Sequence, residues 1–481
     1  MSVTAAPAWA PVGSLRTRVV RAALWTLGGE YASHILRFGS NLVLTRLLMP
    51  DMFGLMVLVN AFLIGLALFS DIGLKPNIIQ SKRGDDPDFL DTAFTIQVGR
   101  GILLWLFACA AAWPLARFYG HPEIQQLLPV AGLQALVGGM ISPRVMTHAR
   151  HLSLGRATLL GLGSTAAGAF VMIVWALLRP SVWALVAGGL AAAATRTIFS
   201  HVILPGRRNV FGWEPAARRE LFRFGRWIFL STLTTFLAAQ SDRLVFAKMI
   251  PLGLLGVYGI ATMLSRLPAE SLGNLGQSVI LPAYSRALER DGRLNPMYAL
   301  VRRRFLVLAG ACMGGLILFG PDLVRILYTA PYEDAGWILQ FSAAGTWFAI
   351  VAQSNGDALL SLGRPAWIAA CNIAKVAAMA VLVPLGFIYY GFVGALAGLA
   401  LAELPKYVLI SVGARRAGLP GWSLEFALSG LLAACAGLAW TLHHLLPEAR
   451  HAWPRAGLVV LMACLAWGPA AFWATRPREC A

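Results

Sequence analysis

Charged residues are scarce in this chain of 481 residues: Asp, Glu, Lys and Arg together make up 13%. That is about half their share in an ordinary soluble domain. Hydrophobic residues make up 58%, and they gather into runs of about 20 residues, the length of a membrane-spanning helix. A bilayer offers no water to the backbone, so runs of this length predict helices rather than a barrel. The composition excludes an ordinary soluble protein.

Signatures of metal, disulfide and nucleotide chemistry are missing as well. The six cysteines are scattered without a CxxC pair or a Cys/His cluster, so we expect neither a structural metal nor a disulfide framework. No Walker motif occurs, so we expect no ATP hydrolysis. We also expect no cleavable signal peptide, because the hydrophobic run after Arg16, Arg18 and Arg21 is too long and too polar for one.

The hydrophobic runs predict an all-α integral membrane protein with about fourteen transmembrane helices. Their connections are short, and the two longest, roughly 205–223 and 282–298, are rich in Arg. No connection is large enough to form a separate soluble domain. We place the spans near 22–48, 52–72, 90–116, 124–147, 157–178, 182–204, 224–250, 253–281, 299–320, 334–361, 366–389, 391–412, 424–446 and 455–474.

Basic residues outnumber acidic ones, 40 Lys and Arg against 22 Asp and Glu, for a net charge of +18. In a soluble protein this excess would favour nucleic acid as a partner. Here the cations lie mostly between the apolar runs, and one alternating set of connections holds about three times as many as the other, as the positive-inside rule describes. We therefore expect no nucleic acid partner, both termini in the cytoplasm and an even number of spans.

The stretch before the seventh predicted span has the pattern of an amphipathic helix at the membrane interface. Its cations suit contact with anionic head groups, so we expect an anionic membrane lipid as a partner. The apolar side holds Trp213, Leu221, Phe222 and Phe224, and the basic side holds Arg218, Arg219 and Arg223.

Three short motifs recur in the same order roughly 200 positions apart, which indicates an internal repeat. Ser153–Arg156 and Ser361–Arg364 both read SLGR. The turn Pro50–Gly54 matches Pro251–Gly256, and a similar Asx-x-Gly turn follows the second and the eighth span. Because six helices preserve orientation, the two copies are parallel six-helix lobes. Transporters built from such repeats place the substrate site between them.

The repeat predicts the organisation of the whole chain. Two further helices follow the second lobe. The predicted parts are a cytoplasmic segment 1–21, a first lobe 22–204, a cytoplasmic linker 205–223 with the amphipathic helix, a second lobe 224–412, and two additional spans within 424–474.

The first span carries an unusual polar stripe for a membrane helix. Glu30, His34, Arg37 and Asn41 recur at steps of four, three and four residues, which places them on one face. Charge inside a bilayer is costly, so this face must meet a water-filled cavity or a partner. The alternative is an internal Glu30–Arg37 ion pair that closes the helix against its neighbours.

Further charges lie in later spans. Asp242 and Arg243 in the seventh span either line the cavity or form a local pair. In the eighth span Thr262 and Arg266 share one face, and Arg266 could instead pair with Glu270.

The remaining intramembrane charges lie in other spans. Asp357 lies in the tenth span, Lys375 lies nearer the middle of the eleventh, and Arg100 lies in the third. Charges near span ends are explained as well by snorkelling to the interface; these are Arg196, Glu403 and Lys406.

Cations outnumber carboxylates at this predicted depth, which favours an anionic substrate. Arginine binds phosphate through two hydrogen bonds and stays charged when it is buried. We therefore predict a substrate cavity lined by Arg37, Arg243, Arg266, Lys375, Asn41 and Thr262. The candidate sites for coupling to H⁺ or Na⁺ are Glu30, His34, Asp242 and Asp357, and no other cofactor is expected.

Several of these segments resemble a known family. The run Arg37–Leu55 (RFGSNLVLTRLLMPDMFGL) looks like the opening of bacterial Wzx-type polysaccharide flippases, and Asp71–Gln80 (DIGLKPNIIQ) ends the second span in the same style. Asp242-Arg243, Tyr258–Ala261 (YGIA) and Leu359–Arg364 (LLSLGR) fit the second half. The resemblance covers roughly residues 22–415. It implies the V-shaped fold of the multidrug/oligosaccharidyl-lipid/polysaccharide (MOP) exporter superfamily, with a cationic central cavity and alternating access.

The resemblance also implies a substrate and a location. The substrate would be an undecaprenyl-diphosphate-linked oligosaccharide, moved from the cytoplasmic to the periplasmic leaflet of the bacterial inner membrane for exopolysaccharide, capsule or O-antigen synthesis. The transport unit would be a monomer that works with a polysaccharide polymerase and export machinery.

Two other transporters and one enzyme class remain as alternatives. A multidrug or organic-cation antiporter of the same superfamily would favour a cavity rich in carboxylates and aromatic residues. A peptidoglycan-precursor (lipid II) flippase would have the same number of spans. A glycosyltransferase or polymerase would need catalytic residues on a sizeable periplasmic loop, so we expect a transporter rather than an enzyme.

Overall fold

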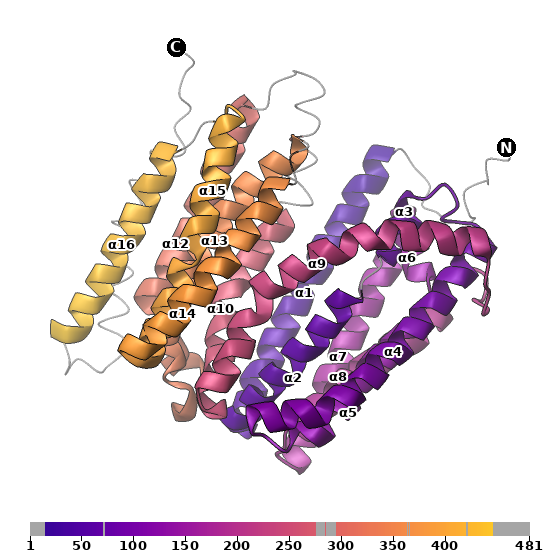
Figure 1. Ribbon diagram of the computed structural model, residues 1–481, viewed down its shortest axis with the longest axis horizontal. Coiled ribbons are helices and arrows are strands. Elements are labelled where there is room, and N and C mark those ends of the chain that lie inside the picture. Colours follow the sequence, from indigo (N-terminus) through magenta and orange to yellow (C-terminus); the bar gives the residue numbers. More distant parts are fainter. Residues whose placement is uncertain are drawn as a thin grey trace. The chain divides into compact units, whose positions relative to one another are not determined.

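The structure is a computed structural model that describes residues 15–70, 73–275, 284, 295–362, 364, 366–419 and 422–445. Within these ranges the secondary structure is helical, and no strand occurs (Figure 1). An all-α fold is therefore confirmed. The last predicted span, 455–474, lies outside the described residues.

The chain forms two compact units, Met1–Gly256 and Val257–Ala481. Nine helices lie in the first unit, and α10 begins within it and continues into the second. The helices of the first unit are α1 (Leu15–Leu47), α2 (Pro50–Phe69), α3 (Leu74–Gln80), α4 (Pro87–Tyr119), α5 (Ile124–Gly139), α6 (Arg144–Arg150), α7 (Leu154–Leu178), α8 (Trp183–Val202) and α9 (Pro215–Met249), followed by α10 (Leu252–Leu275).

The described helices of the second unit follow α10 in the chain. A short 3₁₀ turn, Ala330–Tyr332, connects the first two. α14 contains two helical stretches, because Gly391 has a left-handed φ of 61° that interrupts the helical backbone. The elements are α12 (Asn295–Leu327), α13 (Ala335–Ser361), α14 (Ala366–Leu401), α15 (Glu403–Arg416) and α16 (Trp422–Leu445).

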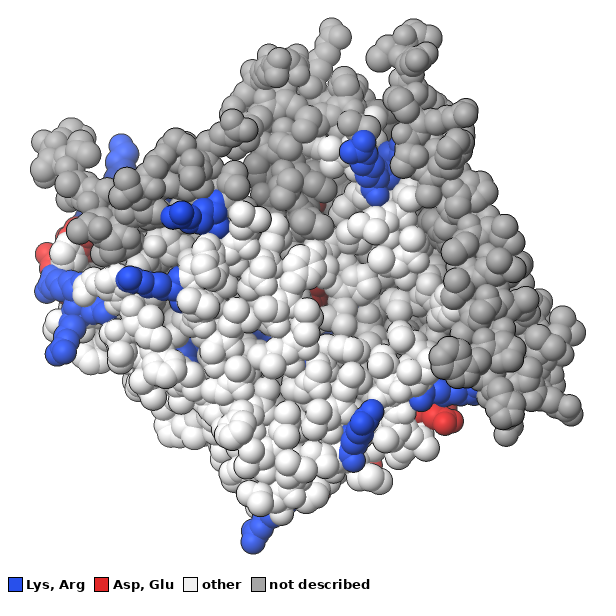
Figure 2. All heavy atoms as spheres, turned by 180° about the vertical axis from the view of Figure 1, so that it is seen from behind, with Lys and Arg blue, Asp and Glu red and all other residues white. Residues whose placement is uncertain are grey.

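Eight helical segments in the described residues are long and apolar enough to cross a membrane, or nine if the bent pair α5 and α6 counts as one span. One of the eight, Trp367–Arg416, covers two predicted spans. Helices α1 and α9, which carry several charged residues, are not among these segments. Fourteen spans thus remains a prediction. On the face in Figure 2, most of the described surface is uncharged, and Lys and Arg gather mainly near its edges.

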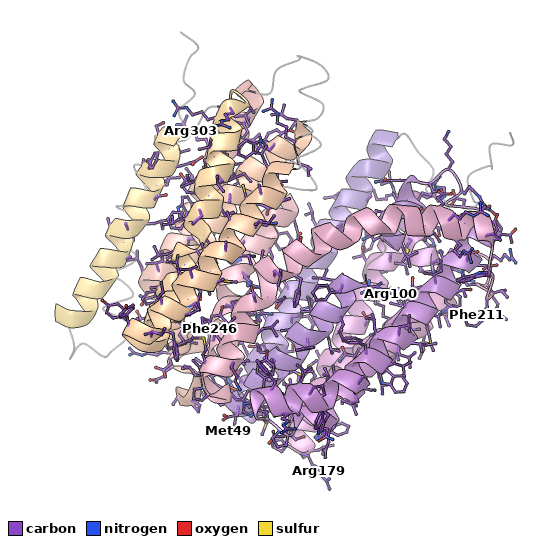
Figure 3. The ribbon with its side chains drawn as sticks, viewed as in Figure 1. Met49, Arg100, Arg179, Phe211, Phe246 and Arg303 are labelled. Carbon is purple, nitrogen blue, oxygen red and sulfur yellow. The ribbon has the colours of Figure 1, made fainter. Side chains whose placement is uncertain are left out.

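Helix α9 joins two regions that the sequence treats separately. The predicted amphipathic segment and the seventh span form one helix of 35 residues. Ala217 and Leu221 are fully buried in a cluster with Leu74, Phe89 and Ile96 of α3 and α4. Of the predicted apolar side, Leu221 therefore packs on protein, whereas Trp213 is 55% exposed and the side chains of Phe222 and Phe224 lie outside the described residues. Farther along α9, Phe246 is also fully buried (Figure 3).

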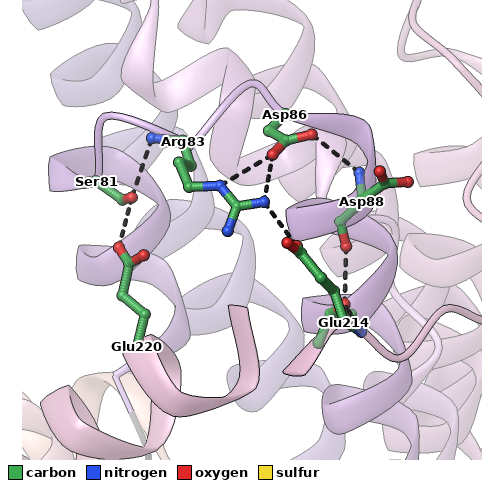
Figure 4. A network of polar contacts seen from close by, with 7 residues as sticks. Ser81, Arg83, Asp86, Asp88, Glu214 and Glu220 are labelled. Carbon is green, nitrogen blue, oxygen red and sulfur yellow. Dashed lines mark hydrogen bonds and ion pairs between the residues drawn. The ribbon is translucent and has the colours of Figure 1, made fainter. Parts of the chain in front are cut away.

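A polar network fastens the start of α9 to the loop between α3 and α4 (Figure 4). Arg83 donates hydrogen bonds to Asp86 at 2.5 and 3.0 Å and to Glu214 at 2.6 Å. Ser81 donates to Glu220 at 2.7 Å. These bonds, chiefly the one to Glu214, raise the pKa of the Arg83 guanidinium. Because this network is about one third exposed, each ion pair contributes only about 0.2–1 kcal/mol.

The linker before α9 is held by its backbone. The backbone amide of Val210 donates a hydrogen bond to the Asp91 carboxylate, and that of Gly212 donates one to the Thr95 hydroxyl, each at 3.0 Å. Arg207 lies 3.5 Å from the second oxygen of Asp91. These contacts attach the linker to one side of α4. The boundary between the two units falls after α9, at Gly256, and the predicted lobe boundaries at 205–223 remain a prediction.

The two turns that the repeat pairs lie against each other. A Cβ atom on Gly54 would overlap the carbonyl oxygen of Leu252, and one on Gly256 would overlap that of Pro50. The start of α2 therefore meets the start of α10 backbone to backbone. Glycine at both positions is a requirement of this close approach. The two turns that the repeat relates by sequence are therefore in contact.

Candidate functional site: the charged side chains of the predicted translocation path

The polar stripe of α1 forms as its spacing predicts. Glu30 and Arg37 are exposed, and His34 and Asn41 are partly exposed. The Nε2 atom of His34 lies 3.9 Å from a carboxylate oxygen of Glu30, one helical turn away. Arg196 of α8, a second cation of the first unit, is exposed as well.

The opposite face of α1 packs against α7. Gly29 lies against Thr158, and Trp25 lies against Gly155. Ala22 and Gly29 are buried. A helix that buries small residues on one side and carries charge on the other has the composition expected at the border of a polar space.

The second charged position of the first unit is near the end of α9. Asp242 is buried, 6% exposed, and Arg243 donates to the side-chain oxygen of Gln240 at 3.0 Å. Tyr119 of α4 donates its hydroxyl to the backbone oxygen of Leu244 at 3.3 Å. Asp242 and Arg243 thus lie on a segment that packs on its neighbours.

In the second unit, the two predicted site residues of α10, Thr262 and Arg266, differ in their exposure. Thr262 is buried, and its hydroxyl donates to the backbone oxygen atoms of Tyr258 and Gly259 within α10. Bonds of this kind satisfy the hydroxyl inside its own helix. Arg266 is partly exposed. Its neighbour Ser265 lies within 3.5 Å of the Thr346 hydroxyl on α13.

Lys375 and Asp357 both have partners inside the second unit. Lys375 of α14 forms an ion pair with Glu403 of α15, and both side chains are less than 15% exposed. The amide of Gln353 donates to Asp357 at 3.3 Å, and Asp357 is 8% exposed. The Lys375–Glu403 pair joins two residues that the sequence placed in different groups, one in the cavity and one at a span end.

A larger buried network was not foreseen. Arg302 of α12 and Glu425 of α16 form an ion pair in which they are 4% and 1% exposed. The Tyr407 hydroxyl donates to Glu425 at 2.7 Å, and the Arg302 Nε donates to Ser354 at 3.3 Å. In the sequence Arg302 stands beside Arg303 and Arg304, a cluster typical of a cationic connection. The signal that points to the pair is Glu425 itself, a carboxylate inside an apolar segment that requires a cationic partner.

A second buried chain runs beside this network. The Tyr298 hydroxyl donates to the side-chain oxygen of Asn355 at 2.6 Å, and the Asn355 amide donates to Ser411 at 3.1 Å. Together the two chains of contacts tie α12, α13, α15 and α16. This polar core connects four helices of the second unit and leaves the predicted site residues of α10 outside it.

The predicted site residues fall into two sets, one in each unit. Metal binding has no candidate among the residues that the structure describes, because they contain no group of three or more His, Cys, Asp or Glu that could hold an ion. That the two sets share one cavity remains a prediction. The first unit holds Glu30, His34, Arg37, Asn41, Asp242 and Arg243, and the second holds Thr262, Arg266, Asp357 and Lys375.

A family model described as polysaccharide biosynthesis protein matches residues 43–336, more than half of the chain. The chain belongs to this family. Relatives with curated descriptions include the succinoglycan biosynthesis transport protein ExoT of Rhizobium meliloti. It is 21% identical over 67% of this chain and 65% of its own length. The chain thus spans slightly less than two thirds of ExoT.

A second relative aligns over more of its length. The lipopolysaccharide biosynthesis protein WzxC of Escherichia coli is 21% identical over 82% of this chain and 80% of its own. The amylovoran biosynthesis protein AmsL of Erwinia amylovora is 24% identical over 52% of this chain and 64% of its own. The family resemblance seen in the sequence is confirmed.

Solved structures with the same fold are membrane transporters. The lipid II flippase MurJ in an inward closed conformation superposes with a TM-score of 0.72 over 93% of this chain and 98% of its own, at 11% identity. An inward-facing multidrug transporter of the MATE family and MOP superfamily gives 0.63 over 83% and 96%, at 14% identity. Identities this low show the fold alone. Together with the apolar helices, they make this family member a multi-pass membrane protein with a MOP-type fold.

Proposed function

We propose that this protein is a flippase for lipid-linked oligosaccharides in bacterial polysaccharide synthesis. Membership of the polysaccharide biosynthesis family carries the proposal, and ExoT, described as a transport protein, supports it. The substrate would be an undecaprenyl-diphosphate-linked repeat unit that crosses from the cytoplasmic to the periplasmic leaflet of the inner membrane. The protein acts as a transporter and leaves the covalent structure of its substrate unchanged.

The cationic residues give the proposal its chemistry. A diphosphate that leaves the head-group region loses hydration, and charged hydrogen bonds from Arg compensate for part of that loss. Arg37 is exposed on the polar face of α1, and Arg266 is partly exposed on α10. In this mechanism Arg37, Arg243 and Arg266 contact the diphosphate, with Asn41 and Thr262 beside them. Lys375, the fourth cation of the predicted site, forms an ion pair with Glu403.

Coupling to an ion gradient would return the empty carrier. The carboxylates Glu30, Asp242 and Asp357 and the imidazole of His34 are the candidates in this proposal. Glu30 and His34 are neighbours at 3.9 Å on the polar face of α1.

The test is polysaccharide export in a strain that lacks this protein and carries plasmid-borne variants. Arg37→Ala, Arg266→Ala and the double variant should reduce export, and lipid-linked repeat units should accumulate in the cytoplasmic leaflet. Arg179→Ala is the matched control, because Arg179 is exposed just beyond the end of α7 and outside the proposed site. Export at the wild-type level by the double variant, at equal abundance in the membrane, would remove the diphosphate role of both residues.

The fold similarity to MurJ makes lipid II the alternative substrate. A complementation experiment separates the two substrates, because a lipid II flippase would restore growth in a strain depleted of its own lipid II flippase. We expect no such complementation by the wild-type chain.

A further inference from the structure

The first unit contains an elongated cavity that the proposed translocation site does not use. It has a volume of about 840 Å³ and lies between α2, α4, α9 and the residue Trp213 that precedes α9. Its walls include Phe62 and Phe69 of α2, Leu103 and Phe107 of α4, and Phe236 of α9. Phe69 and Phe236 are in ring contact at 5.0 Å between centroids. The volume lies in the range of sites that hold one small ligand.

The polar groups of this cavity gather at one end. Ser70 ends α2, and its hydroxyl accepts a hydrogen bond from Arg100 Nε at 2.8 Å. Arg100 also donates to the backbone oxygen of Ala67 at 2.6 Å. Figure 3 shows Arg100 in the space between α4 and α9. Among the described residues that line the cavity, Arg100 is the only charged one.

A second cation and an aromatic ring stand at the same end. Trp213 is 55% exposed, and the guanidinium of Arg218 lies 5.6 Å from its ring centre. Tryptophan next to cations is the composition of a membrane–water interface. The predicted topology places this end, which includes the close of α2, at the cytoplasmic face. Anionic lipids are concentrated in that leaflet.

The length of the cavity fits one hydrocarbon chain in one leaflet. Its lining on α4 runs from Thr95 to Phe107, twelve residues or roughly 18 Å of helix. Half of a hydrocarbon core of ~30 Å is ~15 Å. Arg100 lies within this stretch, and from Arg100 to Phe107 the lining extends seven residues, roughly 10 Å. An acyl chain whose phosphate lies at Arg100 would therefore pass Phe107 before it reaches the bilayer midplane.

We propose that this cavity binds one acyl chain of an anionic glycerophospholipid of the cytoplasmic leaflet, with the phosphate at Arg100 and Trp213. The apolar walls replace the lipid tails that surround a free phospholipid. Arg100 supplies the charge complementarity. This site is separate from the proposed diphosphate residues, so its test does not depend on flippase activity.

The experiment measures lipid binding to purified, delipidated protein by native mass spectrometry. The probes are phosphatidylglycerol, phosphatidylcholine with the same acyl chains, and undecaprenyl phosphate. We expect wild-type protein to retain phosphatidylglycerol over phosphatidylcholine. Arg100→Gln should weaken phosphatidylglycerol binding on the order of tenfold, the size of one charged hydrogen bond, and leave phosphatidylcholine binding unchanged.

A second variant tests the cavity without altering charge. Leu103 is 67% exposed in the open cavity, so Leu103→Trp narrows the space without overpacking the core. It should reduce binding of both phospholipids. Leu177→Trp, at a side chain 63% exposed on α7, is the matched control and should bind as the wild type does.

Two results would overturn the proposal. Phosphatidylglycerol binding that is unchanged in both Arg100→Gln and Leu103→Trp would place the bound lipid elsewhere. Undecaprenyl phosphate binding that is lost in Leu103→Trp, without a specific phosphatidylglycerol signal in the wild type, would assign the cavity to an isoprenoid chain instead.

Discussion

Removing the carboxylate of Glu425 should destabilise the second unit more than removing the whole ion pair. Glu425 is 1% exposed and Arg302 is 4% exposed. Glu425→Ala leaves the Arg302 guanidinium buried without its counter-charge, which costs about 3–5 kcal/mol. The Tyr407 hydroxyl also loses its acceptor at 2.7 Å, which adds about 1–3 kcal/mol if no water replaces it.

The double variant Arg302→Met, Glu425→Leu should behave differently. It removes both charges and replaces them with apolar side chains of similar size. Exchanges of this kind are often neutral or stabilising, so we expect a stability within about 2 kcal/mol of the wild type. The strongly non-additive result is the expected signature, because the single substitution is penalised mainly by the charge that remains.

Thermal denaturation of the purified protein in detergent measures the global effect. A loss of about 4 kcal/mol in a cooperative unit of this size lowers the midpoint by roughly 8–16 °C. Cys435 of α16 gives a local measure, since its thiol is 4% exposed. In a background where the other five cysteines are serine, Glu425→Ala should make Cys435 react faster with a maleimide. A single variant as stable as the wild type, or a double variant less stable than the single, would refute the buried-charge reasoning.

Two further predictions concern contacts that the structure places inside each unit. Gly54→Ala and Gly256→Ala should each reduce the amount of folded protein in the membrane, because the new methyl groups would overlap backbone oxygens. Size-exclusion chromatography measures the amount of folded protein. Gly28→Ala is the control and should match the wild type, because Gly28 has open space around it. Lys375→Glu and Glu403→Lys should each lower thermal stability, because each leaves two like charges together. The charge-swapped double variant should recover most of the loss. The same midpoint of thermal denaturation in all three variants would show that the ion pair contributes nothing.

The sequence alone determined the class of the protein and much of its chemistry. Apolar runs near 20 residues require helices in a bilayer, because backbone groups there need internal hydrogen bonds. The period of the α1 stripe places Glu30, His34 and Arg37 on one face, and that follows from helix geometry alone. The repeat related two glycine turns by sequence, but it did not predict that they touch; that contact is a finding of the structure.

Tertiary structure decided which charges have partners. Lys375 and Glu403 lie 28 positions apart, and Arg302 and Glu425 lie 123 apart, so no helical period relates the members of either pair. Arg302 stands beside Arg303 and Arg304 at the start of a predicted span, where a cation needs no buried partner. The packing of α12 against α16 buries it. The sequence alone allows Leu221, at the start of α9, to face either lipid or protein. Its burial on α3 and α4 depends on helices more than 100 residues earlier in the chain. Local periodicity fixes the face on which a residue lies, and only the packing of distant helices decides what that face meets.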